Sequence, residues 1–324
     1  MRIHKIRIFV AAAASLACGL SFGQGTADYP NKPVRVIVAF AAGGGADAQT
    51  RMFAQKMSEN MKRQFVVENR TGGGGTIAYA YTAKSAPDGY TLLAVSPTFT
   101  IAPALHQNLT YDAVADFAPI SLMSRAPYLV LAHPSLPLRS IQNLIALARA
   151  KPGALNMGVT TGGSTHLATA YFADAARIKV TIVSYKGTAQ AMLDTLSGQI
   201  HLFFGNVVAT LPHVKSGRLR VLGVSSTERS SVLPELPTIA ESGLRGFDVS
   251  TWQGWAAPAG TPAPIINKLS EELARVSRSP IITKILVEDG GEPVGSPPEP
   301  LRKLIADEVP RWRKVVQELG VRAE

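Results

Sequence analysis

Short apolar runs alternate with amphipathic segments along most of the 324-residue chain. Apolar runs between turn residues are typical of buried strands, and apolar residues spaced three or four apart are typical of helices. The runs predict strands at 34–40, 65–67, 90–95, 117–123, 128–132, 155–159, 180–184, 200–204, 219–224 and 247–257. The helical spacing predicts helices near 47–62, 77–84, 141–148, 164–176, 188–197, 265–276 and 301–319, the last kinked or split at Pro310.

This alternation predicts an α/β fold whose mostly parallel sheets are flanked by helices. Twice a strand leads through glycines into a helix, after Phe40 and after Val159, which indicates two similar lobes. Ligands of such sheets bind beyond the carboxyl ends of the strands, so facing glycine loops would form a cleft between hinged lobes. We expect 24–126 and 250–324 to form the first lobe and 127–249 to form the second.

The first 23 residues have the pattern of a secretory signal peptide. Arg2, Lys5 and Arg7 precede an apolar run at 8–20, and Ser21-Phe22-Gly23 supplies small residues for cleavage. The run is too short to cross a bilayer comfortably, and no later segment has about 18 uninterrupted apolar residues. We therefore expect a soluble mature protein that is exported to the periplasm.

The only cysteine, Cys18, lies inside this segment, so the mature chain has no thiol chemistry or disulfide. Ser15 stands three positions before it, where a lipoprotein signal has a branched aliphatic residue, which argues against lipidation. Without the segment the chain has 30 basic and 23 acidic residues, a net charge of +7. The basic residues are scattered, which is typical of a solvated surface, so no nucleic acid partner is predicted.

Three glycine-rich loops each follow a strand and precede a helix, at 43–45, 72–75 and 162–163. Glycine leaves backbone N–H groups accessible, and the start of a helix carries partial positive charge. Such a site suits a carboxylate or a phosphate. Three such loops predict a protein that holds a small anionic or polar ligand largely through its backbone.

Two other interpretations of the first loop remain open. Gly43, Gly45 and Ala48, with Glu68 about twenty residues further on, also fit the fingerprint of a dinucleotide site. That interpretation predicts an exported NAD-dependent oxidoreductase, but it leaves the other two loops unexplained and lacks a convincing proton donor. The loop is alternatively a plain tight turn with Asp47 as the helix N-cap.

The remaining candidates for chemistry give no catalytic, cofactor or metal site. Ser164 is not in a G-x-S-x-G elbow, and His166 has either a packing role or a ligand contact. The four-glycine loop indicates either close backbone approach to a ligand or a flexible lid. Trp252 and Trp255 are expected in the core or in the cleft wall. No metal-binding spacing occurs among the other histidines, which include His106, His133, His201 and His213.

A set of short motifs recurs in order across nearly the whole mature chain. The motifs are Tyr29-Pro30-Asn31-Lys32-Pro33, Gly43-Gly44-x-x-Asp47-x-x-x-Arg51, Val67-Glu68-Asn69-Arg70-x-Gly72, Pro87-Asp88-Gly89-Tyr90-Thr91-Leu92, Gly163-Ser164-Thr165-His166-Leu167, Tyr185-Lys186-Gly187, Gly198-Gln199-Ile200 and Ala257-Pro258-Ala259-Gly260-Thr261-Pro262. Together they resemble the substrate-binding proteins of tripartite tricarboxylate transporters, the Bug-type solute receptors. The resemblance implies a two-lobed periplasmic-binding-protein-like fold that closes on a small carboxylate and delivers it to a membrane permease.

In that family, the loops that open the two lobes pinch the ligand carboxylate. Carried onto this chain, the resemblance implies the ligand-binding residues Ala42, Gly43, Gly44, Asp47, Thr71, Gly72, Ser96, Thr98, Thr161, Gly162, Ser164, Thr165, His166, Lys186, Gly187, Thr188 and Asn206. The family often has proline before the first glycine pair, where this chain has Ala41 and Ala42. It also commonly has Asn-Arg-Pro-Gly, where this chain has Thr71 in place of the proline. The solute class stays open among tricarboxylates, dicarboxylates, acidic amino acids and aromatic acids. A monomer is expected, and a sensor that presents its solute to a membrane signalling partner is the alternative to transport.

Overall fold

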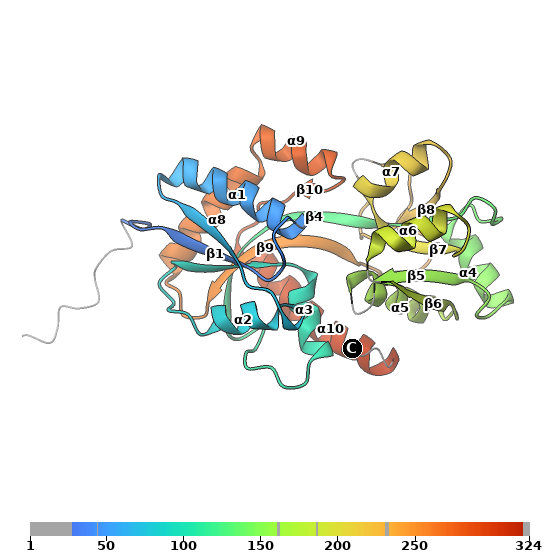
Figure 1. Ribbon diagram of the computed structural model, residues 1–324, viewed down its shortest axis with the longest axis horizontal. Coiled ribbons are helices and arrows are strands. Elements are labelled where there is room, and N and C mark those ends of the chain that lie inside the picture. The colour runs from blue at the N-terminus through green and yellow to red at the C-terminus, as the bar shows by residue number, and fades with distance from the viewer. Residues whose placement is uncertain (1–27, 44, 161–162, 186, 231–232, 320–324) are drawn as a thin grey trace, which may run out of the picture.

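The computed structural model describes residues 28–319 except 44, 161–162, 186 and 231–232. The predicted signal peptide therefore lies outside the described residues. Figure 1 shows two lobes, joined by the long strands β4 (Phe117–Ala132) and β9 (Ser250–Pro258). These strands pair antiparallel with each other and belong to a sheet that is continuous through both lobes, in the order β2-β1-β3-β9-β4-β7-β5-β6.

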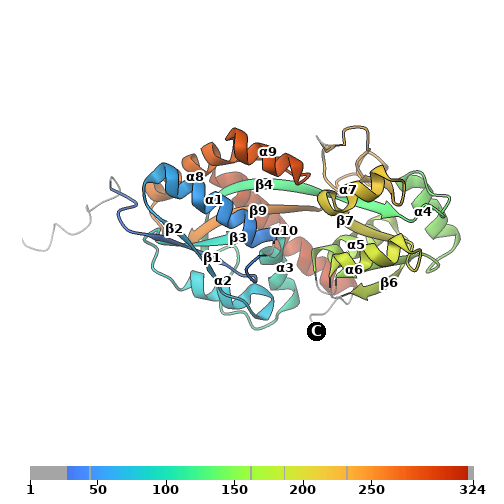
Figure 2. The same ribbon diagram turned by 45° about the horizontal axis from the view of Figure 1, so that its top comes forward.

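The first lobe is built on three parallel strands that β9 and the beginning of β4 extend. These strands are β1 (Val34–Val38), β2 (Phe65–Asn69) and β3 (Thr91–Val95). Helices α1 (Gly45–Met61) and α8 (Ala263–Ser277) cover one face, and α2 (Thr76–Ala83), α3 (Pro97–Leu105) and α10 (Pro298–Leu319) cover the other (Figure 2). The side chains of β1 alternate accordingly, since Val36 and Ile37 belong to different buried clusters.

The second lobe is built on the end of β4 and three parallel strands, β5 (Asn156–Thr160), β6 (Thr181–Tyr185) and β7 (Leu202–Asn206). The short strand β8 (Arg220–Val224) also pairs with β4. The helices of this lobe are α4 (Ile141–Ala150), α5 (Ser164–Ala176), α6 (Thr188–Leu196) and α7 (Val207–Lys215). Ser140 caps α4 as predicted, because its side chain accepts a hydrogen bond from the backbone N–H of Asn143.

Two predicted elements differ in the structure. The two strands expected at 117–123 and 128–132 are a single strand, β4, because the run between them continues in register with β9. The sequence predicted a kink or a split at Pro310, and helix α10 runs unbroken through that residue, so the split is wrong. Its buried residues Ile305, Val309, Trp312 and Val315 keep helical spacing across the proline, and their packing outweighs the lost hydrogen bond.

Among the residues described, three α-helices and one strand were not predicted. The helices are α3, α7 and α9 (Pro280–Glu288), and the strand is β10 (Glu292–Pro293), which pairs with β4. Prolines lie inside α3 and α7 and begin α9, and proline lowers the helical signal of a sequence. Within the residues described, no helix is both long enough and apolar enough to span a bilayer.

Candidate functional site

The strand register makes the carboxyl ends of the two sets of parallel strands face each other. Val95, at the end of β3, lies level with Leu122 of β4, because both pair with Gly254 of β9. Asn206, at the end of β7, pairs with Tyr128 of β4. Since β3 runs in the direction of β4 and β7 runs against it, the two ends point toward each other across about 20 Å of strand.

A pocket of about 480 Å³ lies where the two lobes meet. The start of α1 lines it from the first lobe with Gly45 and Gln49, and the start of α7 lines it from the second lobe with Asn206. Thr251 of β9 and Ser124 of β4 lie between them, and α9 closes one side. The Gln49 side-chain amide donates a hydrogen bond of 2.5 Å to the hydroxyl of Ser124, which ties α1 to the crossing strands.

Asp47 organises the first glycine loop. Its side chain is 3% exposed, and it accepts hydrogen bonds from the Gly43 backbone N–H (2.9 Å), from Arg51 Nε (2.9 Å) and from Asn69 Nδ2 (2.8 Å). The hydrogen bond from Arg51 lowers the pKa of Asp47 to about 2, and those from Gly43 and Asn69 act in the same direction against burial. Asp47 lies inside the first turn of α1, so it fixes the loop without standing at the N-cap position.

The backbone conformation of the four-glycine loop requires glycine at each of its four positions. Gly72, Gly73, Gly74 and Gly75 all have positive φ angles (119°, 56°, 62° and 100°), which side chains disfavour. A Cβ atom on Gly75 would lie 2.6 Å from the ring of Tyr79. The predicted ligand residues Thr71 and Gly72 are exposed and do not line the pocket.

The other first-lobe candidates follow the neighbouring strand ends. Ser96 is buried directly after β3 and is the N-cap of α3, and Thr98 is half-buried in the first turn of that helix. Ala42 is exposed in the loop before α1. Gly44 lies outside the described residues.

Second-lobe candidates come together as a cluster of hydroxyl groups at the ends of β5 and β6. The hydroxyls of Thr160 and Thr188 are 3.1 Å apart, and the backbone N–H of Thr160 donates to the hydroxyl of Thr165 (3.1 Å). Gly187 is the N-cap of α6, where a Cβ atom would meet nothing within 4 Å. Thr161, Gly162 and Lys186 were predicted here and lie outside the described residues.

Asn206 and His166 have more specific environments. The Asn206 side chain accepts a hydrogen bond from the Ala209 backbone N–H (3.1 Å), so it caps α7 at the pocket. His166 lies in the first turn of α5, and burial lowers the pKa of its imidazole, which favours the neutral form near pH 7. A neutral imidazole keeps one donor nitrogen for a polar partner.

Tyr128 is a polar residue of this region that the sequence interpretation missed. Its hydroxyl lies 2.7 Å from that of Ser164, and its ring is buried against Phe204. The residue begins the otherwise apolar run 128–132 and therefore resembles a core position. The available signal was its hydroxyl, because a buried tyrosine normally has a hydrogen-bond partner.

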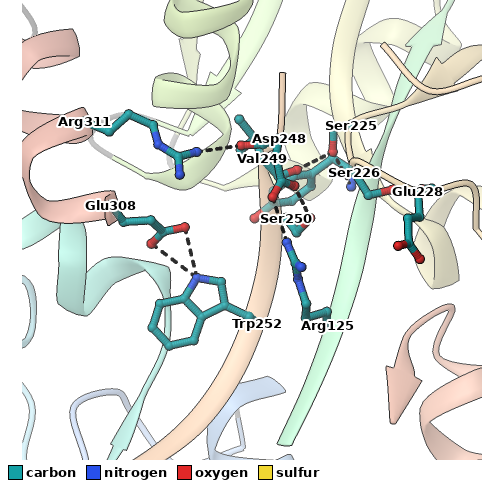
Figure 3. Close-up of polar contacts among 11 residues, drawn as sticks. Arg125, Ser225, Ser226, Glu228, Asp248, Val249, Ser250, Trp252, Glu308 and Arg311 are labelled. Carbon is teal, nitrogen blue, oxygen red and sulfur yellow. Dashed lines mark hydrogen bonds and ion pairs between the residues drawn. The ribbon is translucent and has the colours of Figure 1, made fainter. Parts of the chain in front are cut away.

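Polar contacts link β4, β9 and α10 at the crossing between the lobes (Figure 3). Arg125 Nη2 lies 2.9 Å from Asp248 Oδ2, and Arg311 donates to the backbone oxygen of Asp248 (2.8 Å). Trp252 Nε1 donates to the carboxylate of Glu308 (3.3 Å), which also accepts from Thr100 (2.6 Å) and whose pKa is raised by burial. Both predicted tryptophans, Trp252 and Trp255, are buried, and Trp252 also lines the pocket.

Across the part of the chain that the structure describes, no group of three or more His, Cys, Asp or Glu side chains is arranged to hold a metal ion. Of the predicted ligand residues that the structure describes, only Asn206 lines the pocket. The predicted ligand residues mainly offer hydroxyl, amide and backbone N–H groups. Such groups donate hydrogen bonds to an anion without a buried positive charge.

Comparison with known proteins confirms the resemblance drawn from the motifs. The model of the tripartite tricarboxylate transporter family receptor matches residues 49–321. Protein BugT of Bordetella pertussis is 35% identical over 320 residues, which are 98% of this chain and 97% of BugT.

Solved structures confirm the predicted fold. R. palustris Rpa4515 with adipate matches with a TM-score of 0.74 at 35% identity, over 91% of this chain and 99% of that one. MatC (Rpa3494) from Rhodopseudomonas palustris with bound malate matches with a TM-score of 0.71 at 30% identity, over 89% and 100%. The two-lobed α/β fold is thus that of periplasmic binding proteins. The chain belongs to the tripartite tricarboxylate transporter receptor family, whose members are solute-binding receptors.

Proposed function

We propose that this protein is a periplasmic receptor that binds a small carboxylate between its lobes and delivers it to a tripartite tricarboxylate-type membrane permease. It acts by binding alone, without catalysis. The observation that carries the proposal is the pocket where the helix starts of the two lobes face each other, with Gly45 on one side and Asn206 on the other. The two lobes are 24–126 with 250–324, and 127–249, and residues 1–23 direct export.

Hydrogen-bond donors and helix dipoles favour a carboxylate here. The first N–H groups of a helix have no partner within that helix, and its dipole places partial positive charge beside them. Helices α1, α5, α6 and α7 all begin at the strand ends that face the interlobe gap. Dicarboxylates are the first candidates, because family members have been solved with adipate and with malate.

We propose as binding residues the same set that the resemblance implied, and we assign roles to five of them. Asp47 shapes the loop before α1, and Asn206 caps α7, so both position backbone donors. Ser164, Thr165 and Thr188 supply hydroxyl groups from the second lobe.

A thermal-shift screen tests the proposal on mature protein that has been unfolded and refolded to remove carried-over ligand. The panel contains acetate, malate, adipate, citrate, glutamate and benzoate, with the amide of adipate and NAD for comparison. A ligand at 100 times its dissociation constant stabilises the folded state by about 2.7 kcal/mol, which raises the Tm by a few degrees. Stabilisation by NAD and by no carboxylate would instead support the dinucleotide enzyme.

A pair of variants locates the binding site. A Cβ atom at Gly45 would meet nothing within 4 Å, so this pocket position accepts a side chain. Gly45→Asp places a negative charge at the pocket and should abolish carboxylate binding, whereas the nearly isosteric Gly45→Asn should retain most of it. Equal affinities of the two variants would place the anion elsewhere.

The permease requires its own test. We expect the mature receptor with its bound solute to stimulate solute uptake by vesicles that contain the permease, and a receptor without the solute to give no uptake. Capture of a membrane histidine kinase or another signalling protein, with no effect on uptake, would favour the sensor alternative.

A further inference from the structure

We infer that Tyr128 is a positioning residue that orients the hydroxyl of Ser164 so that it donates its hydrogen bond to the ligand carboxylate. The inference rests on the proposed function, since it concerns how that same site recognises its anion. It adds a residue from the crossing strand β4 to a site otherwise assembled from the loops at strand ends.

Tyr128 is held in place so that its hydroxyl reaches Ser164. The residue is 7% exposed, and its ring packs edge-on against Phe204 with the ring centroids 6.5 Å apart. Its backbone is fixed independently, because its N–H donates to the Ser225 hydroxyl (2.9 Å). The phenol oxygen then lies 2.7 Å from Ser164 Oγ, at the start of α5.

The groups near the Tyr128 hydroxyl connect the pocket with the start of α5. Burial raises the pKa of Tyr128, so its hydroxyl stays protonated and can donate, and the hydroxyl of Thr251 lies nearby. Thr251 lines the pocket on β9, so Tyr128 lies between a pocket residue of one crossing strand and Ser164, the first residue of α5. Tyr128 also pairs across the sheet with Asn206, which caps α7 at the same pocket.

The direction of the hydrogen bond between Tyr128 and Ser164 follows from the acidity of the two hydroxyl groups. A phenol is a much stronger acid than a serine alcohol, so Tyr128 is the better donor of the pair. When Tyr128 donates to Ser164 Oγ, the proton of Ser164 is free for another acceptor, and the first bond polarises the second. A carboxylate near the start of α5 is the acceptor that gains most, because the helix dipole also favours negative charge there.

A double-mutant cycle tests the inference by calorimetric titration of the mature protein with the six carboxylates of the panel. Tyr128→Phe removes one hydroxyl and keeps the ring, and Ser164→Ala removes the group on which Tyr128 acts. We expect Tyr128→Phe to weaken binding of the preferred carboxylate about tenfold, which is about 1.4 kcal/mol. In the Ser164→Ala background the same change should have no effect, because the oriented donor is already absent.

Tyr171→Phe is the matched control. Tyr171 lies on α5, and its ring stacks on Phe247 with the centroids 5.0 Å apart. The variant therefore removes a phenol hydroxyl from the same lobe and leaves the Tyr128–Ser164 pair unchanged. It should bind like the wild type. A structural role for Tyr128 would lower the Tm without coupling to Ser164, so the Tm of every variant is measured as well.

Each outcome has a defined meaning. Unchanged affinity of Tyr128→Phe, or losses that add independently with Ser164→Ala, would overturn the positioning role while leaving the receptor function intact. A wild-type protein that binds none of the six carboxylates would overturn the proposed function, and the positioning role would fall with it.

Discussion

Replacing the buried Asp47 by asparagine tests whether its charge holds the first glycine loop. The carboxylate accepts hydrogen bonds from Arg51, from the Gly43 N–H and from Asn69. Asparagine keeps the shape and one acceptor oxygen, but it presents no charge to Arg51. Its amide nitrogen cannot accept a hydrogen bond, so the variant removes the charge together with at least one of these bonds, and the pH dependence of the loss isolates the electrostatic part.

The magnitude follows from the pKa of Asp47, which its hydrogen bonds, chiefly that from Arg51 and also those from Gly43 and Asn69, lower from 3.8 to about 2. At 1.36 kcal/mol for each pKa unit, this is a ceiling of about 2.4 kcal/mol. The side chain of Arg51 is 49% exposed, so solvent screening reduces the expected loss to about 1–2 kcal/mol. Because the folded-state pKa is the lower one, this stability is present above about pH 4 and is lost as the pH falls toward 2.

Urea unfolding of the mature wild type and of Asp47→Asn between pH 7 and pH 2.5 measures the difference. The two free energies of unfolding should differ by about 1–2 kcal/mol at pH 7 and converge as the pH approaches 2.5. Glu59→Gln changes an exposed carboxylate on the same helix, where Lys56 is its partner, and should have a smaller effect. A difference that stays constant with pH, or that is absent at pH 7, would refute the electrostatic reasoning.

Three further changes are predicted from the structure. Gly75→Ala should lower the free energy of unfolding in urea by about 2–4 kcal/mol, because φ is +100° and the new Cβ atom would lie 2.6 Å from the ring of Tyr79. Its control is Gly217→Ala, where φ is +72° but the space is open, and the loss should be only about 1 kcal/mol. Glu308→Gln should raise the Tm at pH 8 and leave it unchanged at pH 4. Burial raises the pKa of Glu308 in the folded protein, so the wild type loses stability as the pH rises above the pKa that this carboxyl has in the unfolded chain. Arg125→Gln should cost less than about 1 kcal/mol, and less still in 1 M salt, since its ion pair with Asp248 is partly exposed.

Periodicity predicted most of the fold because the elements are short and their burial is regular. The pattern gave α5 its bounds of Ser164–Ala176, and Ser140 was identified correctly as a cap. The three missed helices and the wrong split at Pro310 have a common physical origin in proline. Helix propensity counts Pro310 as a break, but the helix also packs against the sheet on both sides of that residue, and tertiary packing is not part of the local pattern.

The candidate site was less accessible to the sequence than the fold. Glycine loops located the strand ends, but the pattern could not say which polar groups are already used within the protein. Asp47 is one example, since its carboxylate is occupied by its own loop, and Tyr128 is the converse, an apolar-looking position whose hydroxyl reaches a candidate residue. Both facts depend on contacts between segments far apart in the chain or on loop geometry, which periodicity does not encode.

The strand register also predicts that the protein must close to hold a small ligand. The carboxyl ends of β3 and β7 face each other across the segment of β4 from Leu122 to Tyr128, about 20 Å of strand, and malate or adipate is far shorter. Contact with both sets of helix starts therefore requires rotation of the lobes about β4 and β9, and a ligand that gains contacts only in the closed form shifts the population toward it. The radius of gyration from small-angle X-ray scattering should fall when a binding carboxylate is added and should stay unchanged for Gly45→Asp. A ligand that binds tightly with no compaction would mean that one lobe alone forms the site.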